Sequence, residues 1–244
     1  MQIIRSAAFS VQIGAPETIL NFQEYSQFKY GHKPTILKFA KKMVDGLFAF
    51  MPISKLIKNN QDIVITTSPF WHTPPSVYPL ALEVHKLINE KLLDNNANAI
   101  KFVKISRSSA PSCDFSKLTV EERKLNMQRN KLSIDEDSVR DKTVIFIEDA
   151  RITGAHEEKT VACLEQAGAK KVILLYLIDV KNGKNDPDIE NRLNHAVINS
   201  IDELYKLMRK PDEYVLNRRS VRFVLSWADH KELKKFFAKI SRLF

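Results

Sequence analysis

The chain has 244 residues, of which 44% are hydrophobic and 27% are charged. This length suits one sizeable domain, alone or with a smaller appendage, and the composition is too apolar for a disordered protein. Cys113 and Cys163 are the two cysteines, too few for a disulfide framework, and no second pair of metal ligands accompanies them. The composition therefore excludes a disulfide-stapled fold and argues against a zinc site.

The formal net charge of +9 indicates an anionic partner. Lysine and arginine are scattered along the chain, so the phosphates of a small molecule, a nucleic acid and a merely basic surface all stay open as explanations. The N-terminal residues do not join a basic stretch to a long apolar run, and no later segment reaches the apolar length of a membrane span. We therefore expect a cytoplasmic protein with no membrane partner.

Helical and strand-like patterns alternate along the first half of the chain. Residues 34–50 place apolar side chains on one helical face, which predicts a helix that ends before Pro52. The β-branched run 62–67 predicts a strand, and after a proline-rich loop residues 77–93 predict a helix. A second strand is expected at 100–105. This order is typical of a βαβ unit.

The alternation continues after a polar stretch. A capping-box pattern predicts a helix that begins at Thr119. A third strand is expected at 143–147, followed by a helix over 155–167 that ends at Gly168. The run 172–180 is apolar enough to predict a strand that is buried on both faces.

Together these patterns predict an α/β fold with an open, mostly parallel sheet that is flanked by helices. The last sixty or so residues look mainly helical, with a capping box at Ser200 and Glu203 and an amphipathic tail at 229–244. We expect three parts: an N-terminal segment and helix that form a cover (1–60), an α/β core (61–182) and a mainly helical C-terminal extension (183–244).

The segment from Val144 to His156 carries the clearest chemical signal. A buried strand ends in two adjacent carboxylates, Glu148 and Asp149, and a Thr-Gly-Ala turn at 153–155 then opens a helix. Free N–H groups at a helix N-terminus attract a phosphate, and a glycine lets the phosphate approach the main chain. The two acids can accept hydrogen bonds from vicinal hydroxyls, so the local chemistry matches a sugar phosphate. The segment contains neither a P-loop lysine nor a G-x-G-x-x-G motif.

This segment resembles the fingerprint of the type I phosphoribosyltransferase family, in which four apolar residues precede two acids and a small-residue turn with Thr-Gly. The resemblance implies that Glu148 and Asp149 bind the ribose hydroxyls of phosphoribosyl pyrophosphate. It also implies a 5-phosphate loop made of Ala150, Arg151, Thr153, Gly154, Ala155 and His156.

Two residues of this loop depart from the family pattern. Arg151 stands where the family usually has an apolar or small residue, and His156 stands where Thr or Ser is common. Arg151 either adds a cation for the phosphate or marks altered or lost activity. The alternative to a sugar-phosphate site is that residues 144–156 form an ordinary strand-to-helix turn that begins with an acidic pair.

A second resemblance, to the ComF-like branch of the same superfamily, lies upstream. Leu118, Arg123 and Asn126 have the spacing of that branch, although Phe115 stands where the branch usually has Gln. The assignment to the branch is therefore weaker than the assignment to the superfamily.

In the family, a mobile loop before this helix closes over the pyrophosphate, and the polar stretch 106–117 suits that role. The resemblance implies that Lys104 and Arg107, at the start of this loop, stabilise the departing pyrophosphate. A surface loop with incidental charges is the alternative.

The first core strand should be followed by the family's pyrophosphate loop, which is 67–76 in this chain. The hydroxyls of Thr67, Ser68 and Thr73 are suited to meet phosphate oxygens, but the loop contains no glycine, which leaves its geometry open. Trp71 and His72 in this loop are alternatively packing residues.

Two further segments match places from which family members contact the base. The stretch 25–32 combines aromatic residues with a lysine and a glycine, as part of a hood over the base would, although plain packing is the stronger alternative. Asp179, Val180 and Lys181 follow the fourth core strand, but nothing in them identifies the base. The run 221–227 and the tail helix are interpreted as core or as an oligomer contact, so a homodimer stays open.

The resemblance therefore implies an enzyme that transfers ribose 5-phosphate from phosphoribosyl pyrophosphate to a nitrogenous base or a related acceptor and releases pyrophosphate. Mg²⁺ would be held mainly by the substrate's pyrophosphate and ribose hydroxyls. On this basis Asp149→Asn should lower turnover or substrate binding severely without unfolding the chain. The alternative is a non-catalytic regulator that senses phosphoribosyl pyrophosphate and binds nucleic acid, although no helix-turn-helix or aromatic RNA-binding signature supports it. A third hypothesis is phosphoribosyl transfer outside purine or pyrimidine salvage.

Overall fold

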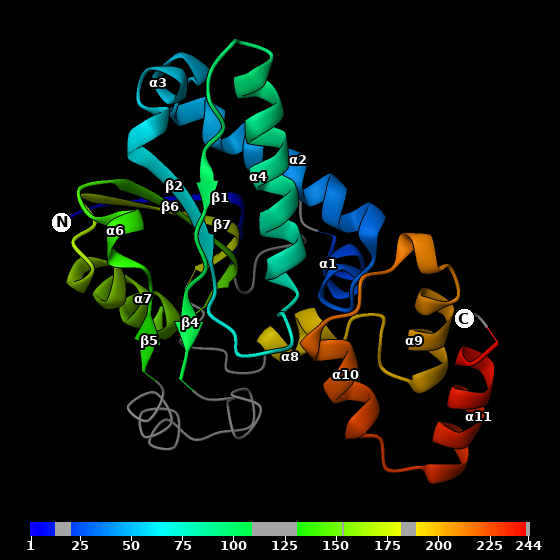
Figure 1. Ribbon diagram of the computed structural model, residues 1–244. Helices are drawn as coiled ribbons and strands as arrows, with labels where there is room; N and C mark the ends of the chain where they lie inside the picture. The colour runs from blue at the N-terminus through cyan, green and yellow to red at the C-terminus, as the bar shows by residue number, and fades with distance from the viewer. Residues whose placement is uncertain (13–20, 109–130, 153, 182–188, 243–244) are drawn as a thin grey trace.

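The computed structural model describes residues 1–12, 21–108, 131–152, 154–181 and 189–242. At its centre lies a parallel five-stranded sheet in the order β1-β7-β6-β2-β3 (Figure 1). Its strands are β1 (Gln2–Gln12), β2 (Ile63–Thr67), β3 (Lys101–Phe102), β6 (Thr143–Arg151) and β7 (Lys171–Lys181). A separate antiparallel pair consists of β4 (Ser106–Arg107) and β5 (Leu132–Ser133).

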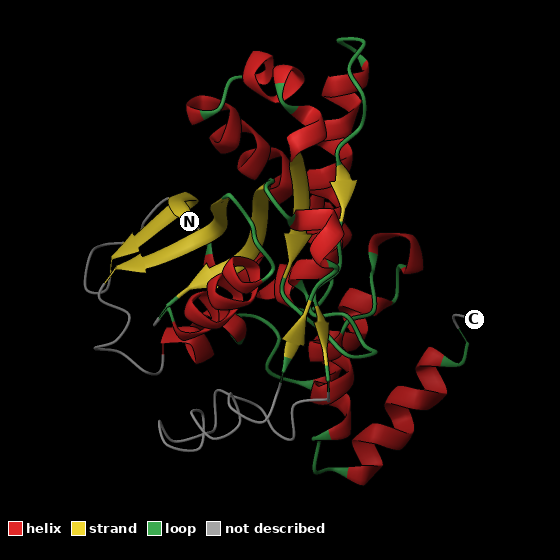
Figure 2. Ribbon diagram, turned by 60° about the vertical axis from the view of Figure 1, so that its left-hand side comes forward, coloured by secondary structure: helices red, strands yellow, loops and turns green. Residues whose placement is uncertain are grey.

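Helices cover both faces of the sheet (Figure 2). The helices that pack on one face are α1 (Phe22–Lys29), α2 (Lys33–Phe50), α3 (Ile53–Lys58) and α4 (Val77–Leu93). The helices that pack on the other face are α6 (Glu136–Val139) and α7 (Ala155–Gln166). The molecule therefore has three layers, with the sheet in the middle.

The central strand β6 shows why its sequence is apolar without interruption. Ile145 and Ile147 pack in the cluster formed with α2 and α4, whereas Val144 and Phe146 pack in the cluster formed with α7. All four side chains are at most 1% exposed. Because side chains of a strand alternate between faces and both faces are covered, every position must be apolar.

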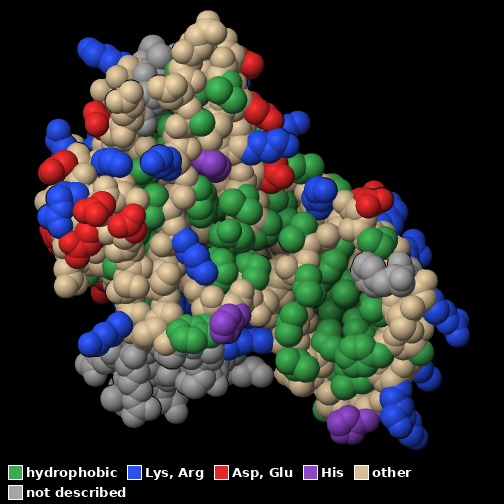
Figure 3. Space-filling view, in the orientation of Figure 1, with side chains coloured by type: hydrophobic (Ala, Val, Ile, Leu, Met, Phe, Trp, Pro, Cys, Tyr) green, Lys and Arg blue, Asp and Glu red, His purple; other side chains and the backbone are tan. Residues whose placement is uncertain are grey.

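Helices also make up the described part of the chain after β7: α8 (Ile189–Asn194), α9 (Ile201–Met208), α10 (Arg218–Leu225) and α11 (His230–Ile240). Ile201, Leu204 and Phe236 form a separate apolar cluster there, together with Tyr30 from the turn after α1. Hydrophobic side chains gather on the surface between α9, α10 and α11 (Figure 3). The C-terminal helices thus pack against the N-terminal part of the chain through a core of their own.

The structure confirms the predicted fold class, and α2, α4, α7 and β7 match their expected ranges closely. The predicted capping box at Ser200 is present: its side chain accepts from the N–H of Glu203, whose carboxylate accepts in return from the N–H of Ser200. The helix expected from Thr119 lies outside the described residues. Short 3₁₀ turns occupy Asn60–Asp62 and Pro211–Glu213.

Two edge strands differ from expectation. The sequence pattern did not predict β1, which pairs with β7 along its whole length and brings the first residues of the 1–60 segment into the sheet. The strand expected at 100–105 is reduced to Lys101–Phe102. Both lie at an edge of the sheet, where a strand needs less continuous apolar sequence. No helix in the described part of the chain is long and apolar enough to cross a membrane.

Candidate functional site

The order of the strands fixes where a ligand can meet the chain. β2 and β6 are neighbours, but β2 leads into α4 on one face of the sheet and β6 leads into α7 on the other. In open α/β sheets, ligands bind at such a reversal, beyond the carboxyl ends of the strands. Thr67 and Ile147 are paired at this end, and Glu148 and Asp149 follow directly.

The two acids at the end of β6 are both buried, Glu148 at 7% and Asp149 at 9% exposure. Ser68 donates a hydrogen bond to Oε2 of Glu148, and the N–H of Asp149 donates to Oε1 at 3.1 Å. The ammonium of Lys29 pairs with Oδ2 of Asp149, and the hydroxyl of Ser76 lies 3.4 Å from the same oxygen. The carboxylates are therefore positioned by neighbours on three segments of the chain.

Burial disfavours the charged form of both acids, but the net shifts of their pKa values are opposite. Burial and the adjacent charge of Asp149 raise the pKa of Glu148 to about 8. Burial alone would also raise the pKa of Asp149, but the ammonium of Lys29 holds it below its usual value of 3.8. Near neutral pH the pair is therefore expected to keep one proton, on Glu148, while Asp149 is ionised.

The loop after β2 brings hydroxyl groups to the carboxylates. Thr67 donates to the carbonyl of Ile147 at 2.7 Å, which ties the ends of β2 and β6 together. Ser68 is the residue of this loop that contacts Glu148. Trp71 is 41% exposed, and its ring stacks edge-on with that of His72 at 5.2 Å. These two rings therefore are not core packing residues in this structure.

The turn between β6 and α7 is open at its glycine. Gly154 has φ of +82°, a left-handed conformation that side chains disfavour, and nothing lies within 4 Å of where a Cβ would stand. α7 begins at Ala155 with no side-chain cap, and His156 is exposed in its first turn. Ala150 is half-buried at the end of β6, and Thr153 lies outside the described residues.

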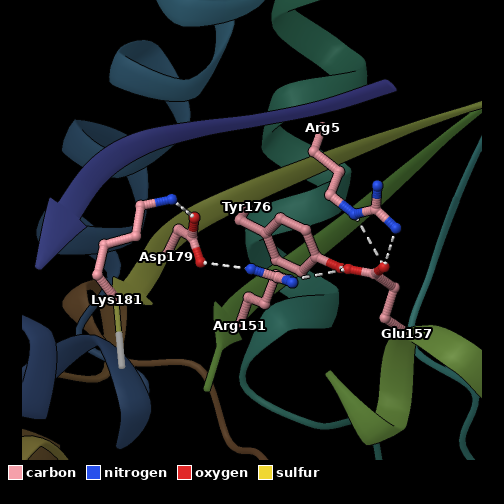
Figure 4. A network of polar contacts seen from close by, with 6 residues as sticks. All are labelled: Arg5, Arg151, Glu157, Tyr176, Asp179 and Lys181. Carbon is pink, nitrogen blue, oxygen red and sulfur yellow. Dashed lines mark hydrogen bonds and ion pairs between the residues drawn. The ribbon is translucent and has the colours of Figure 1, made fainter. Parts of the chain in front are cut away.

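Arg151, one of the two departures from the family pattern, is engaged by carboxylates (Figure 4). Its Nε donates to Glu157 and its Nη1 donates to Asp179, both at 3.1 Å. Asp179 also pairs with Lys181. The charge of Arg151 is therefore balanced within this network, which joins the end of β6 to β7 and to the first turn of α7.

Glu157 is the centre of the same network. Arg5 from β1 donates to it from Nε at 2.9 Å and Nη2 at 2.6 Å, and the hydroxyl of Tyr176 donates at 2.8 Å (Figure 4). Burial alone would raise the pKa of Glu157, but the hydrogen bonds from Arg5 and Tyr176 hold it below its usual value. The negative charge of Glu157, in the first turn of α7, is therefore compensated by its two cationic neighbours.

Glu157→Ala should therefore destabilise the fold by about 2–3 kcal/mol, since it leaves donors on Tyr176 and two arginines without their shared acceptor. The value lies below that of a fully buried pair because the side chain of Arg5 is 47% exposed and can turn to water. The neighbouring Glu158→Ala is the control, because Glu158 is exposed on the same helix. Urea unfolding measures both; equal stability of the two variants would show that the network does not stabilise the protein.

The two cations expected to meet pyrophosphate lie in different surroundings. Lys104 is exposed, and its ammonium lies 4.2 Å above the ring of Phe70. Arg107 is 7% exposed, and its Nε has no hydrogen-bond partner in the described part of the chain. Ser106 pairs with Phe70 in a β-bridge, so β4 runs beside the loop that carries Ser68.

Three contributors to the site were missed by sequence reasoning. Lys29 was noted only as a cation within an aromatic segment, yet it forms the ion pair with Asp149. Ser76 and Asn217 were not singled out; Asn217 is fully buried and donates to the carbonyl of Lys29 at 3.2 Å. The one sequence signal for Asn217 is its place directly before an arginine-rich helix, where it caps the N-terminus by accepting from the N–H of Arg219 at 2.9 Å.

The comparison with curated proteins finds no match. Among solved structures, the chain is similar to a hypoxanthine-guanine phosphoribosyltransferase from Bacillus anthracis, with 14% identity, 67% of this chain and 73% of that chain covered, and a TM-score of 0.36. It is also similar to a purine phosphoribosyltransferase from Pyrococcus horikoshii Ot3, with 15% identity, 58% of this chain and 80% of that chain covered, and a TM-score of 0.31. A third similar structure is a phosphoribosylpyrophosphate synthetase from Mycobacterium smegmatis, with 16% identity, 57% of this chain covered and a TM-score of 0.34. The match covers 33% of the synthetase, so this chain spans about a third of the length of that protein.

The family comparison covers almost the entire sequence. The family model described as PRTase ComF-like matches residues 9–244, which include the strands β2, β3, β6 and β7, the acidic pair and the C-terminal helices. The chain therefore belongs to the ComF-like phosphoribosyltransferase family.

Proposed function

We propose that this protein is a phosphoribosyltransferase, which transfers ribose 5-phosphate from phosphoribosyl pyrophosphate to a nitrogenous base or a related acceptor. The observation that carries the proposal is the pair Glu148 and Asp149, buried at the carboxyl end of β6 between the hydroxyl groups of the loop after β2 and the open turn at Gly154. Acids, hydroxyl groups and a helix N-terminus lie together at the carboxyl ends of the strands. A pentose that carries phosphates on two sides requires these groups for its hydroxyls and its phosphates.

In this proposal the carboxylates of Glu148 and Asp149 accept hydrogen bonds from the ribose hydroxyls. Each carboxylate has about four acceptor positions, so the contacts with Ser68 and Lys29 leave capacity for a ligand. The turn around Gly154 and the first N–H groups of α7 hold the 5-phosphate, with Ala150, Thr153, Ala155 and His156 around it. Arg151 acts from the carboxylate network beside the turn.

The reaction itself moves charge from the pentose to the leaving group. An acceptor nitrogen forms a bond to C1 while the bond from C1 to the pyrophosphate oxygen breaks, and the electron pair leaves with pyrophosphate. Thr67, Ser68, Lys104 and Arg107 stabilise the leaving group, and the carboxylates offset positive charge on the ring. The protein thus contributes position and electrostatics rather than a nucleophile.

The described residues contain no group of three His, Cys, Asp or Glu side chains that would make a metal site by themselves. Two adjacent carboxylates nonetheless supply the oxygen ligands that Mg²⁺ prefers. Glu148 and Asp149 would therefore help to hold a Mg²⁺ that is bound mainly by the substrate, and the ion would supply positive charge against the pyrophosphate.

Two measurements test the proposal in sequence. Calorimetry with phosphoribosyl pyrophosphate and Mg²⁺ should show binding, and pyrophosphate release should then depend on one member of a panel of free bases. A titration without binding contradicts the proposal. Binding without release for any base contradicts the enzymatic part and supports the regulator that senses the same compound.

The raised pKa of Glu148 predicts that ligand binding releases a proton. Below its pKa of about 8 the free protein keeps a proton on Glu148, and hydrogen bonds from ribose hydroxyls favour the ionised carboxylate. Binding should therefore release up to one proton per ligand near pH 7 and much less near pH 9, as calorimetry in buffers of different ionisation enthalpy measures. Glu148→Gln should abolish the difference between the two pH values; an unchanged release in this variant would assign the proton to another group.

A further inference from the structure

The outer side of β1 is the longest sheet edge in the described part of the chain. β1 has 11 residues, about twice the usual length of a strand, and stands at one end of the strand order. β3, at the opposite edge, has only two residues. An edge strand presents a row of N–H and C=O groups with which another strand can pair. Shortness limits such pairing at β3 but not at β1.

β1 also lacks the residues that usually prevent pairing at an edge. Natural edge strands often carry prolines or outward-pointing charges. β1 contains no proline and one charged residue, Arg5. The guanidinium of Arg5 donates to Glu157 from Nε at 2.9 Å and from Nη2 at 2.6 Å, so it is directed toward α7 rather than along the edge (Figure 4). The one charge of β1 therefore does not oppose a strand beside it.

The apolar side chains of β1 are incompletely covered on both faces of the sheet. Ile3 packs against the cluster formed with α7, and Ile4 packs against the cluster formed with α2 and α4. Both are half-buried, whereas Val172 and Ile173, which pair with them on β7, are at most 1% exposed. A strand beside β1 would therefore remove further apolar surface from water on each face.

The main chain of β1 leaves alternate residues directed outward. The N–H of Gln2 donates to the carbonyl of Lys170 on the β7 side at 3.4 Å. Because successive residues of a strand direct their N–H and C=O groups to opposite sides, Ile3, Arg5 and Ala7 direct theirs to the outer edge. Within the described residues, β7 is the one segment that exchanges backbone hydrogen bonds with β1.

A second copy of this chain matches the edge. Identical strands that pair across a two-fold axis run antiparallel, and each contact occurs twice. With the axis at Ser6, Arg5 faces Ala7 of the other copy and Ile4 faces Ala8. Each pair lies on one face, as paired residues must: Ile4 and Ala8 pack on the α2 side, whereas Ala7 packs and Arg5 bonds on the α7 side. Arg5 and Ala7 would then exchange their outward N–H and C=O groups.

Charge and polarity select this register over its neighbours. An axis at Arg5 would set two arginines opposite each other, and like charges in that position destabilise a strand pair. An axis at Ala7 would set Ile4 opposite Ser10, which is exposed. The axis at Ser6 avoids both, because Ser10 then faces Gln2, which is also exposed.

We propose that this protein forms a two-fold symmetric dimer in which the outer edges of β1 pair antiparallel around Ser6. The two five-stranded sheets would then form one continuous sheet. This interface lies outside the acidic pair and does not depend on the proposed function.

The experiment uses the position at which each copy meets itself. Ser6→Lys and Ser6→Glu each set like charges opposite each other, so each should weaken dimerisation at least about tenfold. An equimolar mixture of the two sets Lys opposite Glu and should dimerise again. Ser10→Lys is the control, because it adds the same charge to the same strand opposite an uncharged residue. Thermal unfolding establishes that the variants fold, and sedimentation velocity over a concentration series measures dimerisation.

A second measurement needs no substitution. Hydrogen exchange of the wild-type protein should slow at the amides of Ile3, Arg5 and Ala7 when the protein concentration is raised, because dimerisation covers these groups.

Each contrary outcome overturns the interface. A wild-type protein that stays monomeric, with exchange at these amides independent of concentration, excludes a second copy at this edge. Wild-type dimerisation of Ser6→Lys and Ser6→Glu shows that the copies meet elsewhere. Equal weakening by Ser10→Lys assigns the effect to general charge. Folded Ser6→Lys and Ser6→Glu that do not dimerise when mixed exclude the axis at Ser6.

Discussion

Asp149→Asn should lower kcat/KM by at least about a hundredfold, the scale on which removal of one preorganised electrostatic group acts. In the proposed mechanism Asp149 is the ionised member of the acidic pair, so it both accepts from the ribose and offsets charge on the ring. Pyrophosphate release with phosphoribosyl pyrophosphate and the acceptor from the base panel measures the effect. Asp45→Asn, the same change at an exposed position of α2, is the control.

The structure changes one expectation about this variant. From the sequence, Asp149→Asn should leave the fold intact, but the side chains of Asp149 and Lys29 are only 12% and 9% exposed and form an ion pair. Removal of one partner of a buried pair costs about 3–5 kcal/mol because the other charge stays buried without compensation. The single variant should therefore be less stable as well as less active.

A second substitution separates these two effects. Lys29→Met removes the buried charge at similar side-chain size, so the double variant with Asp149→Asn should regain much of the lost stability without regaining activity. Chemical denaturation and steady-state kinetics on the four proteins form a double-mutant cycle. If the double variant recovers activity together with stability, Asp149 serves only to neutralise Lys29, and its role at the ribose is wrong.

The cycle also shows which part of the site was predictable from sequence. Strand, acids, turn and helix at 144–156 are contiguous, so their order alone indicated a sheet edge that binds a ligand. Lys29 lies 120 residues away from Asp149 along the chain, and only the folding of α1 against the sheet brings them together. A single sequence carries no signal for such a pair beyond the presence of a lysine among aromatic residues.

The same reasoning explains the edges of the sheet. The central strands can be predicted from the sequence, because a strand that is buried on both faces requires an unbroken apolar run. β1 has Arg5, Ser6 and two alanines in its middle, a weak strand pattern, and it is held by pairing with β7 on one side. Its Arg5 is instead explained by Glu157, a partner that the sequence could not identify.

Arg151 shows a limit of comparison with a family pattern. As a departure from the phosphate loop, it suggested either an added cation or altered activity. Its partners, Glu157 and Asp179, come from α7 and β7. Because the sequence does not show that these elements meet at Arg151, it could not predict that carboxylates balance the charge of this arginine. In the proposed function, this network would neutralise Glu157, so that its carboxylate would not repel the 5-phosphate.

Gly31→Ala should destabilise the protein by about 3 kcal/mol or more, through strain and a backbone clash together. Gly31 has φ of +98°, which disfavours any side chain, and a Cβ there would stand 2.1 Å from the carbonyl oxygen of Val215. Because that carbonyl belongs to backbone, no rotamer change can relieve the contact. The only escape is movement of the segment that leads into α10.

Gly46→Ala is the matched control, because the same methyl group there meets nothing within 4 Å. Gly46 lies inside α2, where alanine is favoured over glycine by up to about 1 kcal/mol, so this variant should be more stable than the wild type. Urea denaturation therefore should shift in opposite directions for two identical substitutions. If Gly31→Ala unfolds at the wild-type midpoint, the close contact between the turn after α1 and Val215 does not exist in solution. In that case the segment before α10 would also lose the hydrogen bond from the N–H of Val215 to the carbonyl of Gly31.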